Sequence, residues 1–175
     1  MSGIHTGELV SMNKPTRMPA CHPFDFEPTF HRVAQTNEWN SAIACIASVV
    51  KLPVDAVRLV AATQLKWPVN GRRSVPGKLI PELFDYYDWW AASRYKTANA
   101  VSVLPDLALI LLSKKPDHFV LFHRQKFEDG KPPVCYLINP AHVPVDQHYV
   151  LDVAAILPCK FLSICLMEEY MKDFW

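Results

Sequence analysis

The 175-residue chain carries 18 lysines and arginines against 17 aspartates and glutamates, so its formal net charge at pH 7 is +1. This near-neutral balance excludes the strongly basic surface by which many proteins bind nucleic acid or anionic membranes, and we expect neither partner. Half of the residues are hydrophobic and 20% are charged, which is the composition of one ordinary globular domain with a sizeable core.

Residues 1–30 are rich in proline and show little hydrophobic periodicity. Because proline opposes regular helix, we predict an extended or partly disordered lead-in that wraps the domain. The aromatic side chains of Phe24 and Phe26 are the candidates for anchoring it. The folded domain is then expected to cover residues 31–175.

The stretch from Gln35 to Ala47 predicts a loop that leads into a buried helix. Asn40 has the side chain of a good N-cap, and from Ser41 to Pro53 the chain is mostly apolar and free of glycine. Ser41 is therefore expected at a helix N-terminus, where unpaired N–H groups and the helix dipole stabilise negative charge. Gln35 adds a neutral amide donor to the preceding loop. A side-chain donor and a backbone N–H beside a nucleophile-sized residue form the layout of an oxyanion hole.

The later part of the chain changes from helical to strand patterns. Apolar residues at helical spacing predict helices over residues 54–62 and 76–87, with an Asn-Gly turn signal in the loop between them. Short apolar runs predict strands over residues 107–112, 118–124, 134–138 and 161–166. Asp129-Gly130 marks the hairpin turn between the middle two. Helices followed by antiparallel strands predict an α+β domain, with an N-terminal helical lobe and a C-terminal antiparallel sheet.

Three motifs follow one another in an order and spacing that resemble a known family. Gln35 stands six residues before Ser41, His118 opens an apolar strand, and a later strand ends in Asn139-Pro140-Ala141. This set resembles the papain-like cysteine peptidases, most closely the double-glycine branch that cleaves leader peptides after Gly-Gly. The resemblance covers about residues 35–166 and implies a papain-like two-lobe fold with the site between the lobes.

The resemblance assigns a catalytic role to each of these residues. Ser41 stands where the family has its nucleophilic cysteine, and His118 would be general base and then general acid. Asn139 would orient the imidazole; papain-like enzymes use Asn there, and the double-glycine branch usually has Asp. Gln35 and the backbone N–H of Ser41 would form the oxyanion hole. Asp117 is a rival orienter, although an adjacent side chain rarely reaches back to the ring.

Serine at the nucleophile position is the main departure from the family. A hydroxyl is far less acidic than a thiol, so it cannot form the resting ion pair with His118. One interpretation is an inactivated Cys→Ser form of an active peptidase, which we favour because the other site residues remain. A natural pseudo-peptidase that binds peptide without cutting it is the second interpretation, and a true serine hydrolase is the third.

The remaining histidines and cysteines have no comparable context. Cys45 lies inside an apolar helical stretch, so we expect an inert packed thiol rather than a substitute nucleophile. Cys21, His22, His118 and His123 match no zinc-ligand spacing, and we expect neither a metal nor a cofactor. The other histidines are expected to be solvated or capping: His5, His22, His31, His123, His142 and His148.

The expected function is therefore a cysteine peptidase that cuts a protein or peptide after small residues, with Gly-Gly as the expected sequence. A bacterial effector or toxin domain, restrained by an inhibitory immunity protein, is the expected context. The alternative on the same scaffold is an amidase or acyl-transfer enzyme. Five cysteines at irregular spacing, with no signal-peptide or membrane-spanning pattern, predict synthesis in the cytoplasm, with secretion or delivery into another cell left open.

Overall fold

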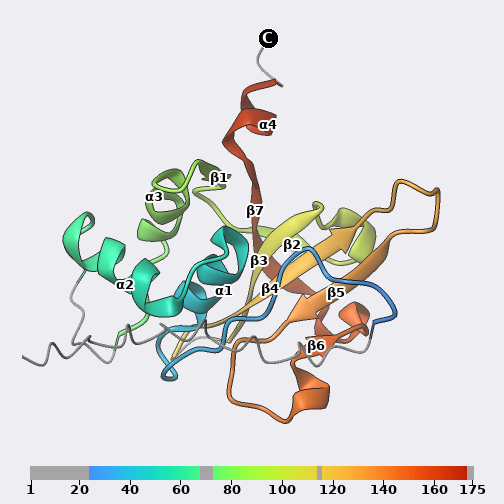
Figure 1. Cartoon of the computed structure of the whole chain (residues 1–175), viewed down its shortest axis with the longest axis horizontal. Coiled ribbons are helices and arrows are strands. Elements are labelled where there is room, and N and C mark those ends of the chain that lie inside the picture. Colours follow the sequence, from blue (N-terminus) through green and yellow to red (C-terminus); the bar gives the residue numbers. More distant parts are fainter. Residues whose placement is uncertain (1–23, 68–72, 114–115, 173–175) are drawn as a thin grey trace, which may run out of the picture.

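The computed structural model describes residues 24–67, 73–113 and 116–172 (Figure 1). Within them, helices come first, antiparallel strands follow, and one short helix closes the chain, so the predicted α+β class is confirmed. Residues 1–23 of the expected lead-in and the predicted Asn70-Gly71 turn lie outside the described residues.

The helices of the first half are α1 (Ser41–Val50), α2 (Val54–Thr63) and α3 (Leu79–Asp85). Helix α1 starts at the predicted residue and ends where Lys51 adopts a left-handed conformation with φ of 58°. Pro53 then precedes α2, which starts at the predicted residue. The three helices gather on one side of the view in Figure 1 and the long strands on the other.

Helix α3 is shorter than the predicted helix over residues 76–87, and that prediction was wrong at both ends. Pro76 and the two residues after it form a turn, closed by the bond from Leu79 N–H to the Pro76 carbonyl at 2.8 Å. At the other end, Asp88 has φ of 60°, which cannot continue a right-handed helix. The predicted apolar face of the helix does face the core, since Ile80, Leu83 and Phe84 are buried.

All the strand pairings within the described residues are antiparallel, and they join seven strands in the order β1-β7-β3-β4-β5-β6, with β2 also paired to β7. The bounds are β1 (Trp89–Ala91), β2 (Lys96–Ala98), β3 (Leu107–Ser113), β4 (His118–Gln125), β5 (Val134–Ile138), β6 (Tyr149–Val150) and β7 (Cys159–Leu166). The four predicted strands correspond to β3, β4, β5 and β7. The predicted hairpin joins β4 to β5, and Gly130 takes φ of 75° in its turn.

Short elements complete the chain. Helix α4 (Met167–Lys172) projects away from the body (Figure 1). Three short 3₁₀ turns connect strands: η1 (Val101–Val103), η2 (Val145–Gln147) and η3 (Val153–Ile156). Neither β6 nor α4 was predicted, because runs of two and six residues are too short to show a period. No helix in the described part of the chain is long and apolar enough to cross a bilayer.

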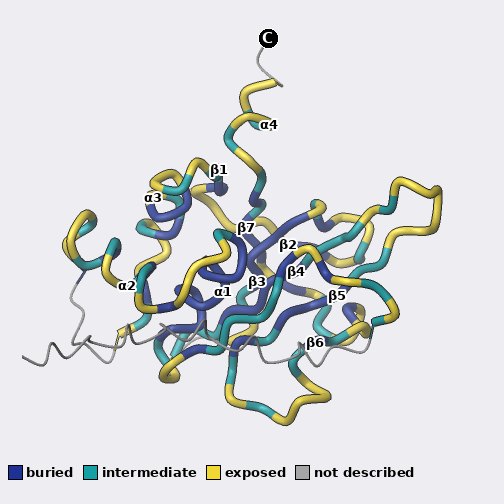
Figure 2. The backbone as a smooth tube through the Cα atoms, viewed as in Figure 1, coloured by how far each residue is buried: buried dark blue, intermediate teal, exposed yellow. Residues whose placement is uncertain are grey.

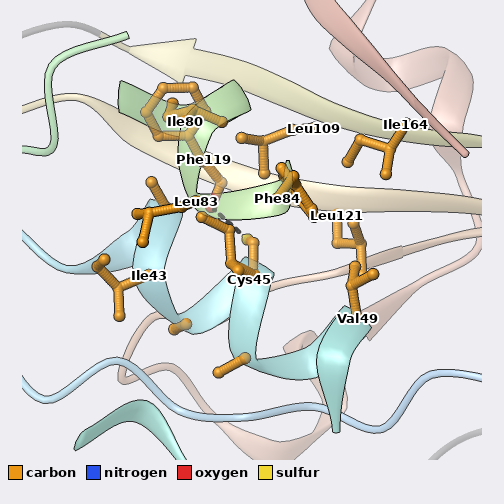
Figure 3. Close-up of a cluster of buried hydrophobic side chains, with 14 of the residues drawn as sticks. Ile43, Cys45, Val49, Ile80, Leu83, Phe84, Leu109, Phe119, Leu121 and Ile164 are labelled. Carbon is orange, nitrogen blue, oxygen red and sulfur yellow. Dashed lines mark hydrogen bonds between the residues drawn. The ribbon is translucent and has the colours of Figure 1, made fainter. Parts of the chain in front are cut away.

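The core forms where α1 packs on β4. Residues 41–49 of α1 are all buried, so the helix is dark blue in Figure 2 up to its last residue, Val50, which is intermediate. Its small alanines allow close approach, and Ile43 and Val49 belong to one buried cluster with Phe119 and Leu121 of β4, in which Val49 lies beside Leu121 (Figure 3). A helix buried on every side holds its first residue rigidly against the strand, which is what positions the candidate site.

The described end of the lead-in packs onto the domain through its aromatics, as predicted for Phe24 and Phe26. These two rings stack at a centroid distance of 4.8 Å, and Phe24 also contacts Tyr136 and Tyr149. Phe30 is 6% exposed and belongs to the core. Residues 24–30 form neither helix nor strand.

Candidate active site

Asn40 stands at the N-cap position of α1 but does not cap the helix with its side chain, so that prediction was wrong. Its Nδ2 instead donates to the Thr36 hydroxyl at 3.0 Å, within the loop that precedes the helix. The Asn40 carbonyl still accepts the first helical bond, from Ala44 N–H at 2.9 Å. The side chain therefore shapes the loop between Gln35 and Ser41 rather than the helix end.

Ser41, the first residue of α1, has no exposed surface. Its hydroxyl donates to the Asp117 carbonyl at 3.0 Å and accepts from the Phe119 N–H at 3.0 Å. These two groups belong to the residues on either side of His118. A hydroxyl has one hydrogen to donate, and because that hydrogen goes to Asp117, Ser41 does not donate to the His118 ring.

His118 opens β4 beside a register shift between Leu111 and Ser113 of β3. Burial lowers the pKa of His118 below its usual value, and a side-chain hydrogen bond with Asn139 raises it in part. A rise in the pKa means that the bond favours the imidazolium, as when a ring N–H donates to an amide oxygen. The structure thus brings together the two side chains that the sequence predicted as base and orienter.

Asn139 directly follows β5 and is held on several sides. Its backbone N–H donates to the His148 carbonyl at 2.9 Å, and its Oδ1 accepts from Ala141 N–H at 3.0 Å. The second bond closes a local turn that suits Asn in the sequence Asn139-Pro140-Ala141. An orienting amide fixed in this way can set which tautomer of His118 is present.

Gln35 is 7% exposed and lies next to the same turn. Its backbone N–H donates to the Pro140 carbonyl at 2.8 Å. Its side-chain Oε1 is buried and has no hydrogen-bond partner among the described residues. Such groups are rare in proteins and cost about 1–3 kcal/mol, so the position of this amide is not explained by stability.

The four predicted site residues therefore form one continuous set of contacts. Ser41 bonds to the backbone around His118, His118 bonds to Asn139, and the turn after Asn139 bonds to Gln35. These residues come from a helix N-terminus, a strand start, a strand end and a loop. Their order and spacing, through the resemblance to the papain-like family, predicted that they would meet.

Asp117, the rival orienter, is placed differently. Its N–H donates to the Ser74 hydroxyl at 3.1 Å and its carbonyl accepts from Ser41. Its carboxylate adds to the effect of burial, which raises the pKa of Tyr95 to about 12. The side-chain bond to the His118 ring comes from Asn139.

Cys45, one turn beyond Ser41, is fully packed, as predicted. Its Sγ lies 3.6 Å from the Phe119 carbonyl, and burial raises the pKa of the thiol (Figure 3). A thiol with a raised pKa and 1% exposure is a poor nucleophile. Ser41, one turn earlier, is the residue of the two that bonds to both neighbours of His118.

His123 was predicted to be solvated or capping, and this prediction was wrong. Its ring packs against Phe30 at 4.8 Å, its Nδ1 lies 3.0 Å from the Tyr136 hydroxyl, and burial lowers its pKa to about 4. It lines an open hollow of about 520 Å³, together with Trp89 and Asp106, at the opposite end of β4 from His118. Its partners Phe30 and Tyr136 are distant in sequence, so no local sequence pattern predicts these contacts.

Comparison with known proteins adds no identification. No family model matches this chain, and no curated protein matches it. The assignment of a function therefore depends on the geometry of the site.

Proposed function

We propose that this domain has the site of a papain-like cysteine peptidase of the double-glycine type, silenced by serine at position 41. The observation that carries the proposal is that Ser41, at the N-terminus of α1, bonds to the residues on both sides of His118, whose ring pairs with Asn139. A base, its orienter and a helix N-terminus at one point are the parts that a thiolate nucleophile needs. The helices before the sheet agree with the two-lobe arrangement proposed here.

The burial of Gln35 supports the same proposal. The amide is 7% exposed, and its acceptor Oε1 has no partner among the described residues, which opposes the stability of the fold. An oxyanion needs a hydrogen-bond donor, so the role proposed here belongs to the other amide atom, Nε2. An oxyanion hole formed by an amide side chain and a helix N–H would explain why this amide is buried here. In this proposal Gln35 and the backbone N–H of Ser41 stabilise the tetrahedral intermediate.

With cysteine at position 41, the site would act by acyl transfer. The thiolate attacks the peptide carbonyl, His118 as imidazolium gives its proton to the leaving amine, and a thioester forms. His118 then takes a proton from water, which attacks the thioester and releases the acid and the thiol. Asn139 holds the imidazole in place through both steps. The expected substrate is a peptide bond after small residues.

Serine prevents this chemistry for a geometric reason as well as an acidity reason. The hydroxyl of Ser41 fits between two backbone groups at 3.0 Å each. Sulfur makes longer contacts, as the 3.6 Å separation of Cys45 Sγ from the Phe119 carbonyl shows. A cysteine at position 41 cannot keep both serine contacts, so its sulfur is displaced from this closed position.

The test compares the chain with its Ser41→Cys variant on Gly-Gly and control peptides, followed by mass spectrometry. We expect cleavage only in the Ser41→Cys variant, and its loss when His118→Ala is added. A Ser41→Ala variant is the matched control for loss of the hydroxyl. If the Ser41→Cys variant cuts no peptide but releases amide-linked fragments of cell wall, the domain is an amidase and the peptidase proposal fails.

A natural pseudo-peptidase is the second candidate, and one observation favours it. The hydroxyl of Ser41 satisfies two buried backbone groups that sulfur would leave poorly paired, so serine suits this fold. The expected result is that Ser41→Cys lowers the melting temperature and restores no cleavage, while the chain itself binds peptide. A Ser41→Cys variant that is as stable as the original and cuts peptide contradicts this candidate.

A further inference from the structure

Residues 32–35, here called the bracing segment, join α1 to the sheet. Val33 N–H donates to the hydroxyl of Ser48 in α1 at 3.0 Å, and Arg32 N–H donates to the hydroxyl of Tyr149 in β6 at 2.9 Å. The segment itself forms neither helix nor strand, so such contacts define its position. Its last residue, Gln35, is bonded to the turn that follows Asn139.

The guanidinium of Arg32 binds that same turn at three consecutive carbonyls. Its Nε donates to the Asn139 carbonyl at 2.6 Å, and its Nη2 donates to those of Ala141 at 2.6 Å and Pro140 at 3.3 Å. Charge-assisted bonds of this length are stronger than neutral ones. A planar fork that grips successive carbonyls fixes the direction of the backbone between them.

The charged guanidinium of Arg32 binds backbone carbonyls and forms no ion pair with a described residue. Among the described residues, no carboxylate pairs with this guanidinium. Burial lowers the pKa of Arg32, although a guanidinium stays charged at any physiological pH. Placing a half-buried cation here is costly unless its donors are used, and the three carbonyls use them.

We propose that Arg32 is a positioning residue that fixes Asn139 against His118 and Gln35 beside them by holding the carbonyls of residues 139–141. The carbonyl of Asn139 is one of its acceptors, so the backbone that carries the orienting amide is held directly. The bond from Gln35 N–H to the middle carbonyl attaches the oxyanion donor to the same turn. The inference depends on the proposed function only for the catalytic roles of these residues.

The test measures the pKa of His118 by NMR titration of its imidazole in the full chain, which requires no enzymatic activity. Because the Asn139 bond raises this pKa, its loss in Asn139→Ala should lower the pKa of His118. We expect Arg32→Ala to lower it by about as much, and Arg32→Ala with Asn139→Ala to lower it no further. Asp117, the neighbouring carboxylate, is unchanged in every variant, so its effect cancels. Loss of the Arg32 cation by itself would raise the pKa of His118, so a fall in Arg32→Ala reports the lost bond to Asn139, and Arg32→Lys, which keeps the charge, separates the two effects.

Arg124→Ala is the matched control. Arg124 also donates to a backbone carbonyl, that of Val101 at 2.9 Å, but at the other end of β4. We expect this variant to leave the pKa of His118 unchanged. A folded Arg32→Ala variant in which the pKa of His118 equals that of the Arg124→Ala variant overturns the proposal, and so do additive shifts in the double variant.

If Arg32→Ala does not fold, Arg32→Lys tests the same proposal by the same titration of His118. An ammonium keeps the charge but lacks the fork, so we expect a shift between those of the original chain and Asn139→Ala. An unshifted pKa of His118 in Arg32→Lys overturns the proposal. Failure of Ser41→Cys to cut peptide would refute the proposed function alone, because these titrations are made with Ser41 in place.

Discussion

The two ends of β4 each carry a histidine, and the surroundings of the two rings are opposite in kind. His118 opens the strand and bonds to Asn139, an amide held by a turn. His123, near the other end, is enclosed by Phe30 and Tyr136. Burial lowers the pKa of both rings. A lowered histidine pKa therefore does not by itself indicate an active site. The groups that contact each ring distinguish a candidate catalytic histidine from a structural one.

The hydrogen bonds around His123 determine that its Nδ1 carries a hydrogen. Gln125 Nε2 donates to the Glu27 carbonyl, so its Oε1 faces the Tyr136 hydroxyl and accepts from it at 3.1 Å. The Tyr136 oxygen must then accept from His123, which therefore carries its hydrogen on Nδ1. This ring is a neutral, fixed part of the structure, whereas the ring of His118 bonds to an amide that favours its charged form.

The largest expected effect separates the two histidines by activity. In the Ser41→Cys background, His118→Ala should reduce kcat/KM by about 10³-fold, because it removes the acid and base. His123→Ala should change kcat/KM by less than about 10-fold under conditions where the variant is folded. Steady-state kinetics on a Gly-Gly peptide measures both. Equal losses in the two variants would show that the roles assigned to the ends of β4 are wrong.

The next effect is the dependence of stability on pH. The pKa of His123 is about 4 in the folded chain and about 6.5 in the unfolded chain, so between these values only the unfolded state gains a proton. The contribution is fully present above pH 6.5 and is lost as the pH falls to 4, by at most about 3 kcal/mol. His123→Gln should flatten this part of the curve in urea unfolding experiments. An unchanged slope would mean that His123 is not the group responsible.

A smaller loss is expected for Ser41→Ala. This change leaves the Phe119 N–H and the Asp117 carbonyl without the serine hydroxyl, at a cost of about 2 kcal/mol in the free energy of unfolding. Ser48→Ala is the comparison variant on the same helix. Its hydroxyl also bonds to two backbone groups, those of Val33 and Ala44, but neither belongs to β4. A loss below about 0.5 kcal/mol for Ser41→Ala would show that its two bonds do not hold α1 to β4.

The smallest effect is expected for Tyr136→Phe. It leaves the ring of His123 without its acceptor and should cost about 1 kcal/mol in the free energy of unfolding. The pKa of His118 should not change, because Tyr136 does not bond to it. Thermal unfolding and the imidazole titration measure the two quantities separately. A shifted pKa of His118 would connect two ends of β4 that we regard as independent.

The sequence predicted the elements that have a strong local pattern. The start of α1 at Ser41 and of β5 at Val134 came out at the right residue, because an apolar run begins abruptly at each. The meeting of Gln35, Ser41, His118 and Asn139 was predicted from their order and spacing in a resembling family. Their catalytic roles stay predictions until cleavage is measured.

The errors arose where distant contacts overrode local preference. Asn40 has the right side chain for a cap, but Thr36 takes its amide. His123 looked exposed in sequence because Phe30 and Tyr136, which enclose it, come from the lead-in and another strand. Arg32 gave no signal at all, since its acceptors lie more than 100 positions away.

The contacts of the bracing segment with the sheet can form only after residues 139–149 have been synthesised. Arg32 N–H bonds to a hydroxyl 117 positions further along the chain, so a chain leaving the ribosome contains all of α1 long before the residues that complete the candidate site. Contacts of such separation close late in folding, because the intervening loop must be ordered first. The Gln35 amide, which bonds to Pro140, is a direct probe. In refolding followed by hydrogen exchange it should gain protection after the amides of α1, and earlier protection would contradict this order.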